Sequence, residues 1–232
     1  MIIDDILKKK TLNKIDRSIV QEYLPNIIPE KKREYKKLVK EVRNELNRVY
    51  GVFQLGTNLD LKSHKSTKER IEIYPTLYKR IFNLTGKPKS ILDLGCGLNP
   101  LSYIYLGNHL KYIASEWNRK ECLLLEEWFK NNKIKGSVIQ YDLRKENKFP
   151  KVDVVFLFKI LGIFKNHKID EQIIKSLKCK YFIVSFATEI LKGNKMRYPK
   201  QLWFELMLGR LEFNYSKIDF KNESFYIVKM SH

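Results

Sequence analysis

The spacing of hydrophobic residues changes near residue 85 of this 232-residue chain. Before that point, apolar side chains recur every three to four residues in Ile19–Leu24 and again in Tyr35–Val49. This period is typical of amphipathic helices that bury one face. The pattern therefore predicts a helical N-terminal domain over residues 1–84, followed by a domain of a different class over residues 85–232.

The second part of the chain alternates short apolar runs with stretches at helical spacing. Such alternation predicts parallel strands with helices on both faces of the sheet. The last two runs are joined by a short polar turn, which predicts an antiparallel hairpin. The expected strands are 90–94, 112–114, 137–141, 153–157, 181–186, 215–220 and 224–230, and the expected helices between them include 120–131 and 169–177. This α/β arrangement, a Rossmann-like and mostly parallel seven-stranded sheet, resembles the fold of class I methyltransferases that use S-adenosylmethionine (SAM).

The composition adds a strong positive charge to this picture. The chain has 45 basic and 26 acidic side chains, a formal charge of +19. Because like charges repel within a compact protein, such an excess indicates a polyanionic partner, such as nucleic acid or a membrane surface. An enzyme that meets only a small neutral metabolite would leave this charge unexplained. Lysine outnumbers arginine by 35 to 10, so nucleotide bias or a thermophilic habit can supply part of the excess.

The chain lacks the signals of a membrane or secreted protein. No apolar run approaches the roughly 20 residues that a membrane helix needs, and the acidic start at Met1–Asp5 does not resemble a signal peptide. The three cysteines lie far apart and form no C-x-x-C pair, which argues against disulfides and zinc sites. We therefore expect a soluble, cytoplasmic and reduced protein without a metal ion and without a membrane partner.

A run of basic residues lies in the second expected helix, and two interpretations of it remain open. The run can be a solvated helix face on which Glu34, Glu41 and Glu45 form ion pairs. It can equally be a surface that contacts phosphates. The basic side chains of this candidate RNA-binding surface are Lys31, Lys32, Arg33, Lys36, Lys37 and Lys40.

The most informative motif is a glycine-rich turn after the first expected strand, Leu92–Pro100, with the sequence LDLGCGLNP. Gly95 and Gly97 let a ligand approach the backbone where a Cβ atom would obstruct it. Ligands of open α/β sheets bind beyond the carboxyl ends of the strands, where this turn lies. A tight turn without a ligand remains the alternative. Pro100 stands where a dinucleotide-binding motif has its third glycine, and the chain contains no P-loop motif.

Two acidic residues extend this motif at the ends of the next two expected strands. Glu116 is placed to accept hydrogen bonds from both ribose hydroxyls of an adenosyl group, and Asp142 to accept one from the adenine amino group. Taken singly, each acid is more often a solvated loop residue or a helix cap. A glycine turn and two acids at three successive strand ends together predict an adenosine-binding site.

A second motif, His64–Arg70, precedes the glycine turn. Ser66 and Glu69 have the spacing of a capping box, which predicts a helix that begins there and runs toward Phe82. The N-terminus of a helix attracts anions, and Arg70 lies one turn further along. This site is suited to the methionyl carboxylate of SAM.

These motifs together resemble a known family, the 16S ribosomal RNA (guanine-N7) methyltransferases that confer aminoglycoside resistance. Five segments in family order carry the resemblance: 50–53 (YGVF), 64–70 (HKSTKER), 90–101 (SILDLGCGLNPL), 153–159 (DVVFLFK) and 201–205 (QLWFE). Two features depart from the family. Glu116 replaces an aspartate, and the chain is shorter through residues 50–64, as in a compact archaeal-like or thermophile-like homologue.

The resemblance implies roles for individual residues. Arg70 would bind the SAM carboxylate, and Phe158 and Lys159 would form the floor near the transferred methyl group. Trp203 would lie near the target guanine, although its helical spacing fits a core residue as well. The residues implied in cofactor binding are Phe53, His64, Lys65, Ser66, Arg70, Gly95, Gly97, Glu116, Asp142, Leu143 and Phe158. The residues implied near the RNA target are Lys159, Gln201, Trp203 and Glu205.

The implied reaction transfers a methyl group from SAM to N7 of a guanine in the decoding region of small-subunit ribosomal RNA, leaving S-adenosylhomocysteine. Guanine N7 carries a lone pair in the neutral base, so no residue needs to act as a general base and positioning supplies most of the rate. We expect a monomer that acts on the small ribosomal subunit or its RNA. Two alternatives remain open: a methyltransferase for another RNA or base, such as tRNA or adenine N1, and a non-catalytic RNA-binding assembly factor with the same fold.

Overall fold

The computed structural model describes residues 2–13, 15, 17–47, 59–63, 65–107, 109–145, 148–188 and 201–230. The chain divides into two compact units, Met1–Gln54 and Leu55–His232. This division lies earlier than the boundary that the sequence predicts after residue 84. The segment just before that boundary belongs to the larger unit, because Tyr74, Leu77 and Ile81 lie in the core that covers the sheet.

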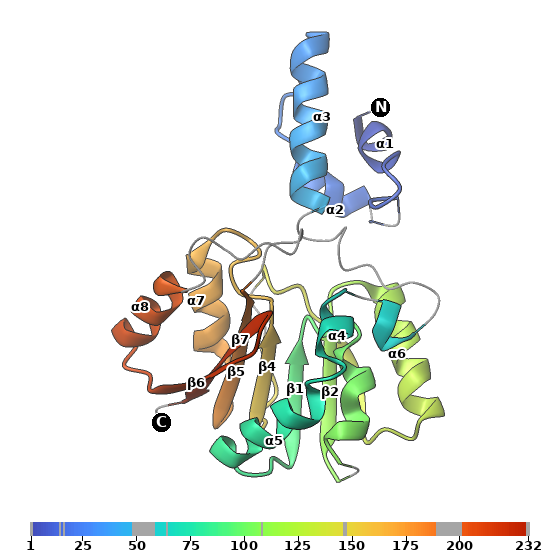
Figure 1. The fold of residues 1–232 in the computed structure, drawn as a ribbon. Helices are drawn as coiled ribbons and strands as arrows, with labels where there is room; N and C mark the ends of the chain where they lie inside the picture. Colours follow the sequence, from blue (N-terminus) through green and yellow to red (C-terminus); the bar gives the residue numbers. More distant parts are fainter. Residues whose placement is uncertain are drawn as a thin grey trace. The chain divides into compact units, whose positions relative to one another are not determined.

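The smaller unit contains three helices among its described residues: α1 (Ile2–Leu7), α2 (Arg17–Glu22) and α3 (Lys32–Leu46) (Figure 1). Its helical class agrees with the apolar spacing of the sequence. Polar contacts join α3 to α1, since the Tyr35 hydroxyl donates to the Asp5 carboxylate at 2.6 Å and the Arg43 guanidinium donates to the backbone carbonyl of Asp5. Val39, Val42 and Leu46 form the buried side of α3.

The larger unit is built on a seven-stranded sheet with the order β3-β2-β1-β4-β5-β7-β6. The five strands β1 to β5 run parallel, and β7 pairs antiparallel with both β5 and β6. This confirms the predicted fold, a mostly parallel sheet that ends in a hairpin. The strands are β1 (Ser90–Leu94), β2 (Lys111–Glu116), β3 (Gly136–Gln140), β4 (Val154–Phe158), β5 (Tyr181–Ala187), β6 (Tyr215–Asp219) and β7 (Glu223–Lys229).

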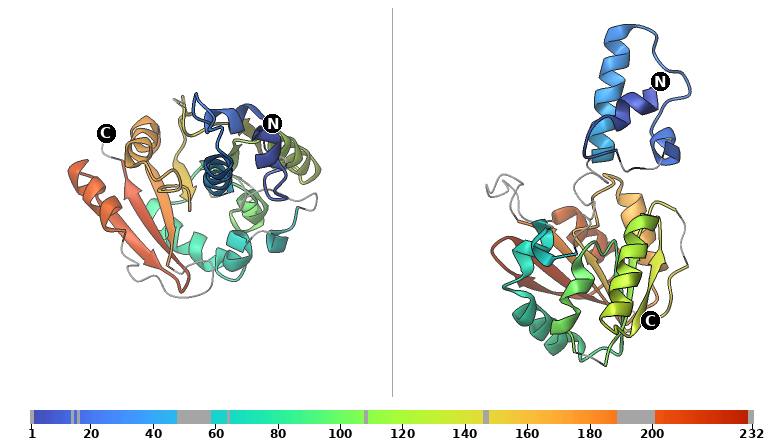
Figure 2. Two further views of the ribbon diagram at one scale, coloured as in Figure 1. Left: turned by 90° about the horizontal axis from the view of Figure 1, so that it is seen from above. Right: turned by 90° about the vertical axis from the view of Figure 1, so that its right-hand side faces the viewer.

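Helices cover both faces of this sheet (Figure 2). On one face α5, η3 and α6 pack against alternate strand residues such as Ile91 and Phe156. On the other face α7 and α8 pack against their neighbours in sequence, Leu92 and Leu157. None of the helices in the described ranges is long and apolar enough to cross a membrane. The helices of this unit are η2 (Leu61–Ser63), α4 (Lys65–Arg70), α5 (Tyr74–Thr85), η3 (Asn99–Tyr105), α6 (Arg119–Asn131), α7 (His167–Ser176) and α8 (Leu202–Arg210).

The structure corrects one predicted helix. The sequence predicts a single helix from Ser66 toward Phe82, whereas the structure has α4, a turn over residues 71–73 and then α5. Pro75 explains the interruption, because it lies at the start of α5 and lacks the N–H group that a continuous helix would bond to the carbonyl of Ile71. Ser66 lies inside α4 instead of capping it, so the capping-box interpretation is wrong.

Candidate functional site

The glycine turn lies at the carboxyl end of β1. Gly95 and Gly97 have φ angles of 60° and 50°, which residues with a side chain rarely adopt. A Cβ atom at Gly95 would also lie 2.4 Å from Cδ1 of Ile160. The backbone N–H of Cys96 donates to the carbonyl of Ser115 at 2.9 Å, which fixes the turn against the end of β2. Backbone atoms are therefore exposed to a ligand where a side chain does not fit.

Glu116 ends β2 beside this turn. Its buried carboxylate accepts hydrogen bonds from the backbone N–H groups of Gly97, at 3.2 Å, and Trp117, at 2.8 Å. Burial outweighs these two bonds and raises the pKa of the Glu116 carboxyl to about 7. The structure thus brings Gly97 and Glu116 into direct contact at one site.

A buried hydrogen-bond network that the sequence analysis missed supports the turn. The Asp93 carboxylate accepts from the Asn99 amide at 2.9 Å and from the Tyr112 hydroxyl at 2.5 Å. The Tyr74 hydroxyl in turn donates to Asn99 at 2.8 Å. Burial raises the pKa of Asp93 to about 6. The motif LDLGCGLNP contains both Asp93 and Asn99, but only the fold shows that α5 and β2 supply their partners.

Asp142 follows β3 at the next strand end, as the sequence predicts. Its carboxylate binds the Arg144 guanidinium at 2.5 and 2.9 Å. Partial burial alone would raise the pKa of Asp142, but Arg144 outweighs it and holds the pKa below its ordinary value. Leu143 is buried in the core on the α7 side of the sheet. A contact of Asp142 with adenine remains a prediction.

Arg70, the last residue of α4, is bound inside the protein. It is 2% exposed, lies over the Phe158 ring at 5.0 Å from the centroid, and donates to both carboxylate oxygens of Glu223 at 2.7 and 2.9 Å. Nζ of Lys159 lies 3.0 Å from a Glu69 oxygen and 3.3 Å from a Glu223 oxygen. The structure therefore brings Arg70, Phe158 and Lys159 together, and their roles at the cofactor remain predictions. It adds Glu223, which the sequence analysis placed in the hairpin turn.

Three of the four residues predicted near the RNA target, Gln201, Trp203 and Glu205, lie at α8, which packs on the opposite face of the sheet from Phe158. The Trp203 ring stacks on the His167 ring with centroids 4.1 Å apart, and its N–H donates to the Gln201 side chain at 3.0 Å. Glu205 accepts a hydrogen bond from the Tyr226 hydroxyl at 2.7 Å. These contacts give Trp203 a packing role between α7 and α8, and contact with RNA remains a prediction.

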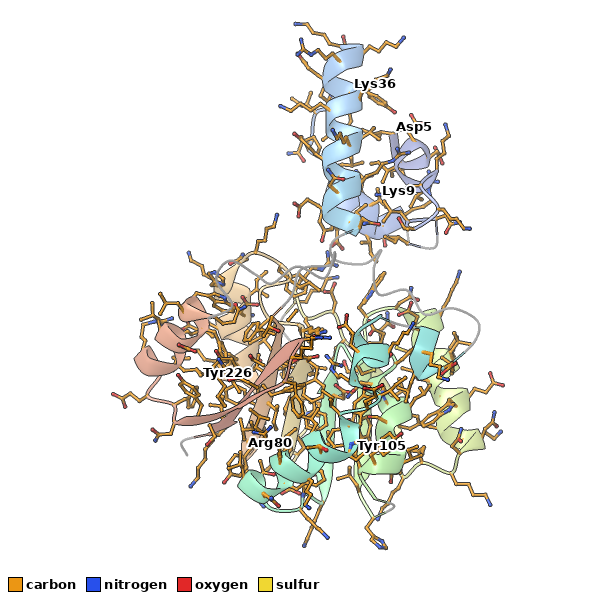
Figure 3. All side chains as sticks on the ribbon, in the orientation of Figure 1. Asp5, Lys9, Lys36, Arg80, Tyr105 and Tyr226 are labelled. Carbon is orange, nitrogen blue, oxygen red and sulfur yellow. The ribbon has the colours of Figure 1, made fainter. Side chains whose placement is uncertain are left out.

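The lysines of α3 divide between two faces of that helix. Lys32, Lys36 and Lys40 are spaced four residues apart and line a groove between α3 and α1. Lys9, two residues after the end of α1, also lines this groove (Figure 3). Lys37 instead lies 3.9 Å from Glu41 in an ion pair. The ion-pair interpretation of the basic run therefore applies to one face, and the other face presents lysines along a groove.

Three of the predicted cofactor-binding side chains cannot be placed. Phe53 and His64 lie outside the described residues, as does the side chain of Lys65.

The cysteines are free and buried, and burial raises the pKa of the Cys122 and Cys179 thiols to about 12. Neither thiol is therefore a nucleophile near neutral pH. In the ranges that the structure describes, no group of three or more His, Cys, Asp or Glu residues is arranged to hold a metal ion.

The strand order, the glycine turn after β1 and the buried acid after β2 define a class I methyltransferase fold. Comparison with known families identifies the family. The model of the ribosomal RNA methyltransferase family FmrO matches residues 17–227, so the chain belongs to this family. This match confirms, at the level of the family, the resemblance that the sequence motifs show.

Known relatives and structures agree with this assignment. The 16S rRNA (guanine(1405)-N(7))-methyltransferase of Proteus mirabilis is 26% identical over 178 residues, which cover 72% of this chain and 63% of that protein. The chain therefore spans less than two thirds of that relative. A protein of the same name from Serratia marcescens is 25% identical over 230 residues, 88% of this chain and 89% of the relative.

The fold is confirmed by a solved structure. The 16S rRNA methyltransferase RmtF, in complex with S-adenosyl-L-homocysteine, superposes with a TM-score of 0.78 at 20% identity. The superposition covers 99% of this chain and 97% of RmtF. The likeness therefore extends over both units of the sequence, and at this level of identity it concerns the fold alone.

Proposed function

We propose that this chain transfers a methyl group from SAM to N7 of a guanine in 16S ribosomal RNA. The observation that carries the proposal is the strand-end site in which the Gly97 N–H binds the buried Glu116 carboxylate, within a chain that the FmrO family matches over 17–227. The names of the Proteus mirabilis and Serratia marcescens relatives specify this reaction, and RmtF binds the demethylated cofactor.

The residues of the site fit an adenosyl group. An ionised carboxylate offers about four acceptor positions, and Glu116 uses two of them on the N–H groups of Gly97 and Trp117. The remaining positions suit the two hydroxyls of a ribose. Gly95 and Gly97 allow a ligand to pass close over the turn. We propose Arg70 as the partner of the methionyl carboxylate and Asp142 as the partner of adenine.

Bound SAM supplies an electrophilic methyl group on its sulfonium sulfur. Guanine N7 attacks with its own lone pair, so the protein removes no proton beforehand and contributes by orientation and by exclusion of water. Phe158 is buried at the carboxyl end of β4, and Lys159 follows it with its backbone N–H bonded to the carbonyl of Ser185 at 3.0 Å. We propose that these two residues face the transferred methyl group.

The groove between α1 and α3 is the proposed contact with the RNA backbone. Residues four apart on a helix are separated by about 6 Å along its axis, so Lys32, Lys36 and Lys40 are placed to meet successive phosphates of one strand. Lys9, which follows α1, and Arg43 of α3 also line the groove, together with the one acid Asp5. Gln201, Trp203 and Glu205 are proposed to contact the RNA closer to the target base.

The test is to incubate small ribosomal subunits with the protein and SAM and to map the modified base. Borohydride and aniline cleave RNA at 7-methylguanine, so primer extension should stop after one guanine in the decoding region. The Glu116→Ala variant serves as the control without cofactor binding. If the label from SAM appears on adenine or on tRNA, the proposed target is wrong. If the protein binds SAM but labels no RNA, it is a non-catalytic RNA-binding protein.

A further inference from the structure

Three charged side chains from distant parts of the chain meet inside the larger unit. Arg70 ends α4, Lys159 follows β4 and Glu223 begins β7. The side chains of Arg70 and Glu223 are 3% and 2% exposed, and that of Lys159 is 15% exposed. Both cations share the one carboxylate of Glu223, so we refer to these three residues as the charge triad.

The triad is costly for the fold. Removing charges from water has a large unfavourable free energy, which their mutual attraction often fails to recover. Lys159 also has a φ of 59°, in the left-handed region that non-glycine residues rarely adopt. Buried ion pairs and strained residues that persist at such a cost are concentrated at functional sites. The carboxyl edge of β4 is such a place, because ligands of open α/β sheets bind at this edge.

The charges of the triad do not cancel. Burial alone would raise the pKa of Glu223, but Arg70 and Lys159 outweigh it and hold the pKa below its ordinary value, so Glu223 is ionised. Within the triad the two cations exceed the one carboxylate by a single charge, and Glu69 supplies the balancing negative charge 3.0 Å from Lys159, with a side chain that is 25% exposed. Lys159 is thus held between two carboxylates. The capacity to bind a further anion therefore lies with Arg70.

The hydrogen bonds of Arg70 hold its guanidinium on more than one side. Its Nε and Nη2 atoms donate to Glu223, and the Tyr74 hydroxyl is a further hydrogen-bond partner of the guanidinium. The Phe158 ring packs against the flat side of the guanidinium. Because Glu223 and Phe158 together fix the plane of the guanidinium, the Nη1 edge has one orientation before any ligand arrives.

We propose that Glu223 is a positioning residue, which holds Arg70 so that its guanidinium receives the α-carboxylate of the cofactor. This inference rests on the proposed function, because it assumes that SAM binds at this edge. It assigns a role to β7, which carries none of the residues implied by the family resemblance. Glu223 itself makes no contact with the cofactor in this proposal and acts through Arg70.

The test compares two ligands that differ at the amino-acid end. S-adenosylhomocysteine carries the α-carboxylate, and 5′-methylthioadenosine lacks the amino-acid group but keeps the adenosine. In calorimetric titrations, Glu223→Gln should weaken binding of S-adenosylhomocysteine at least tenfold and that of methylthioadenosine less than twofold. Glu171→Gln is the matched control, because Glu171 also binds an arginine, Arg210, through two bonds but on the surface. It should change neither affinity.

Two further variants separate positioning from folding. Glu223→Asp keeps the charge at a shorter reach and should lose S-adenosylhomocysteine affinity selectively, even if Glu223→Gln does not fold. In an Arg70→Gln variant, the additional replacement of Glu223 should not change the ratio of the affinities for S-adenosylhomocysteine and methylthioadenosine any further, because Glu223 acts through Arg70. Equal loss of both ligands, or tighter S-adenosylhomocysteine binding, would overturn the proposal. A wild-type protein that binds neither ligand would instead contradict the proposed function.

Discussion

At the scale of single residues, the Glu116 carboxyl combines burial with a pKa raised to about 7. Ribose hydroxyls donate hydrogen bonds, and the ionised carboxylate is the better acceptor. We therefore expect the affinity for S-adenosylhomocysteine to rise about tenfold between pH 6 and pH 8, as the ionised fraction grows. Calorimetry across this range measures the effect. Glu116→Gln should bind weakly and without this pH dependence, and an equally steep profile in that variant would assign the titration to another group.

The raised pKa of Glu116 lowers the stability of the unliganded fold as pH rises, whereas it raises the expected ligand affinity. The folded-state pKa of Glu116 lies above its ordinary value of 4.5, so between pH 4.5 and 7 the folded protein keeps a proton that the unfolded chain releases. The contribution of this group to the free energy of unfolding is therefore lost as pH rises through that window. Ligand binding to the ionised form offsets this loss, so S-adenosylhomocysteine should raise the melting temperature more at pH 8 than at pH 6.

The sequence predicts some of these residues and not others for a physical reason. Gly95, Gly97 and Glu116 follow strands, and strand ends are visible in the apolar pattern. Glu223 lies 153 residues from Arg70, and their pairing depends on the register of a sheet that no local pattern specifies. The stacking of His167 on Trp203 likewise depends on how α7 and α8 pack.

At the scale of elements, α3 offers a test of the groove. Lys36 lines the groove, whereas Lys37 pairs with Glu41 on another face of the same helix. Lys36→Gln should weaken RNA binding and lower the slope of log affinity against log salt by about 0.7 to 0.9, the value of one lost phosphate contact. Lys37→Gln removes the same charge and should change the slope less. Filter binding over a series of salt concentrations distinguishes them, and equal slopes would contradict a phosphate contact in the groove.

Strands were easier to predict than helix boundaries. The central strand β4 is buried on both faces, so it appears as the continuous apolar run Val154–Phe158. The division between α4 and α5 was missed, although Pro75 marks it in the sequence. The capping-box spacing of Ser66 and Glu69 favoured a continuous helix, and proline at the start of the next helix overrides that local signal.

At the scale of the whole molecule, the charge of +19 and the cofactor site respond to different conditions. RNA binding through lysines releases counterions, so a contact with about six phosphates loses roughly a thousandfold in affinity between 50 and 200 mM salt. The proposed cofactor site contains the buried carboxylate of Glu116 bonded to the backbone of Gly97, and salt screens buried groups weakly. S-adenosylhomocysteine affinity should therefore change less than threefold over the same range. A parallel fall of both affinities would show that the two sites are coupled.

Composition alone indicated a polyanion without distinguishing RNA, DNA or a membrane surface. The order of the motifs at 64–70, 90–101 and 201–205 makes ribosomal RNA the expected partner, and the family match over 17–227 confirms the family. The division into units Met1–Gln54 and Leu55–His232 could not be predicted, because the apolar spacing of α5 resembles that of the N-terminal helices.

The position of β7 between β5 and β6 has a consequence for biosynthesis. As the chain emerges from the ribosome, β6 appears first but pairs with no strand other than β7 in the sheet. The edge of β5 likewise lacks its β7 partner, and the Arg70 side chain lacks Glu223, until residues 223–229 have been made. A nascent chain therefore completes its sheet and its charge triad in the same step. A translation product terminated before that point would carry unpaired strand edges, which chaperones and proteases recognise, rather than a completed sheet.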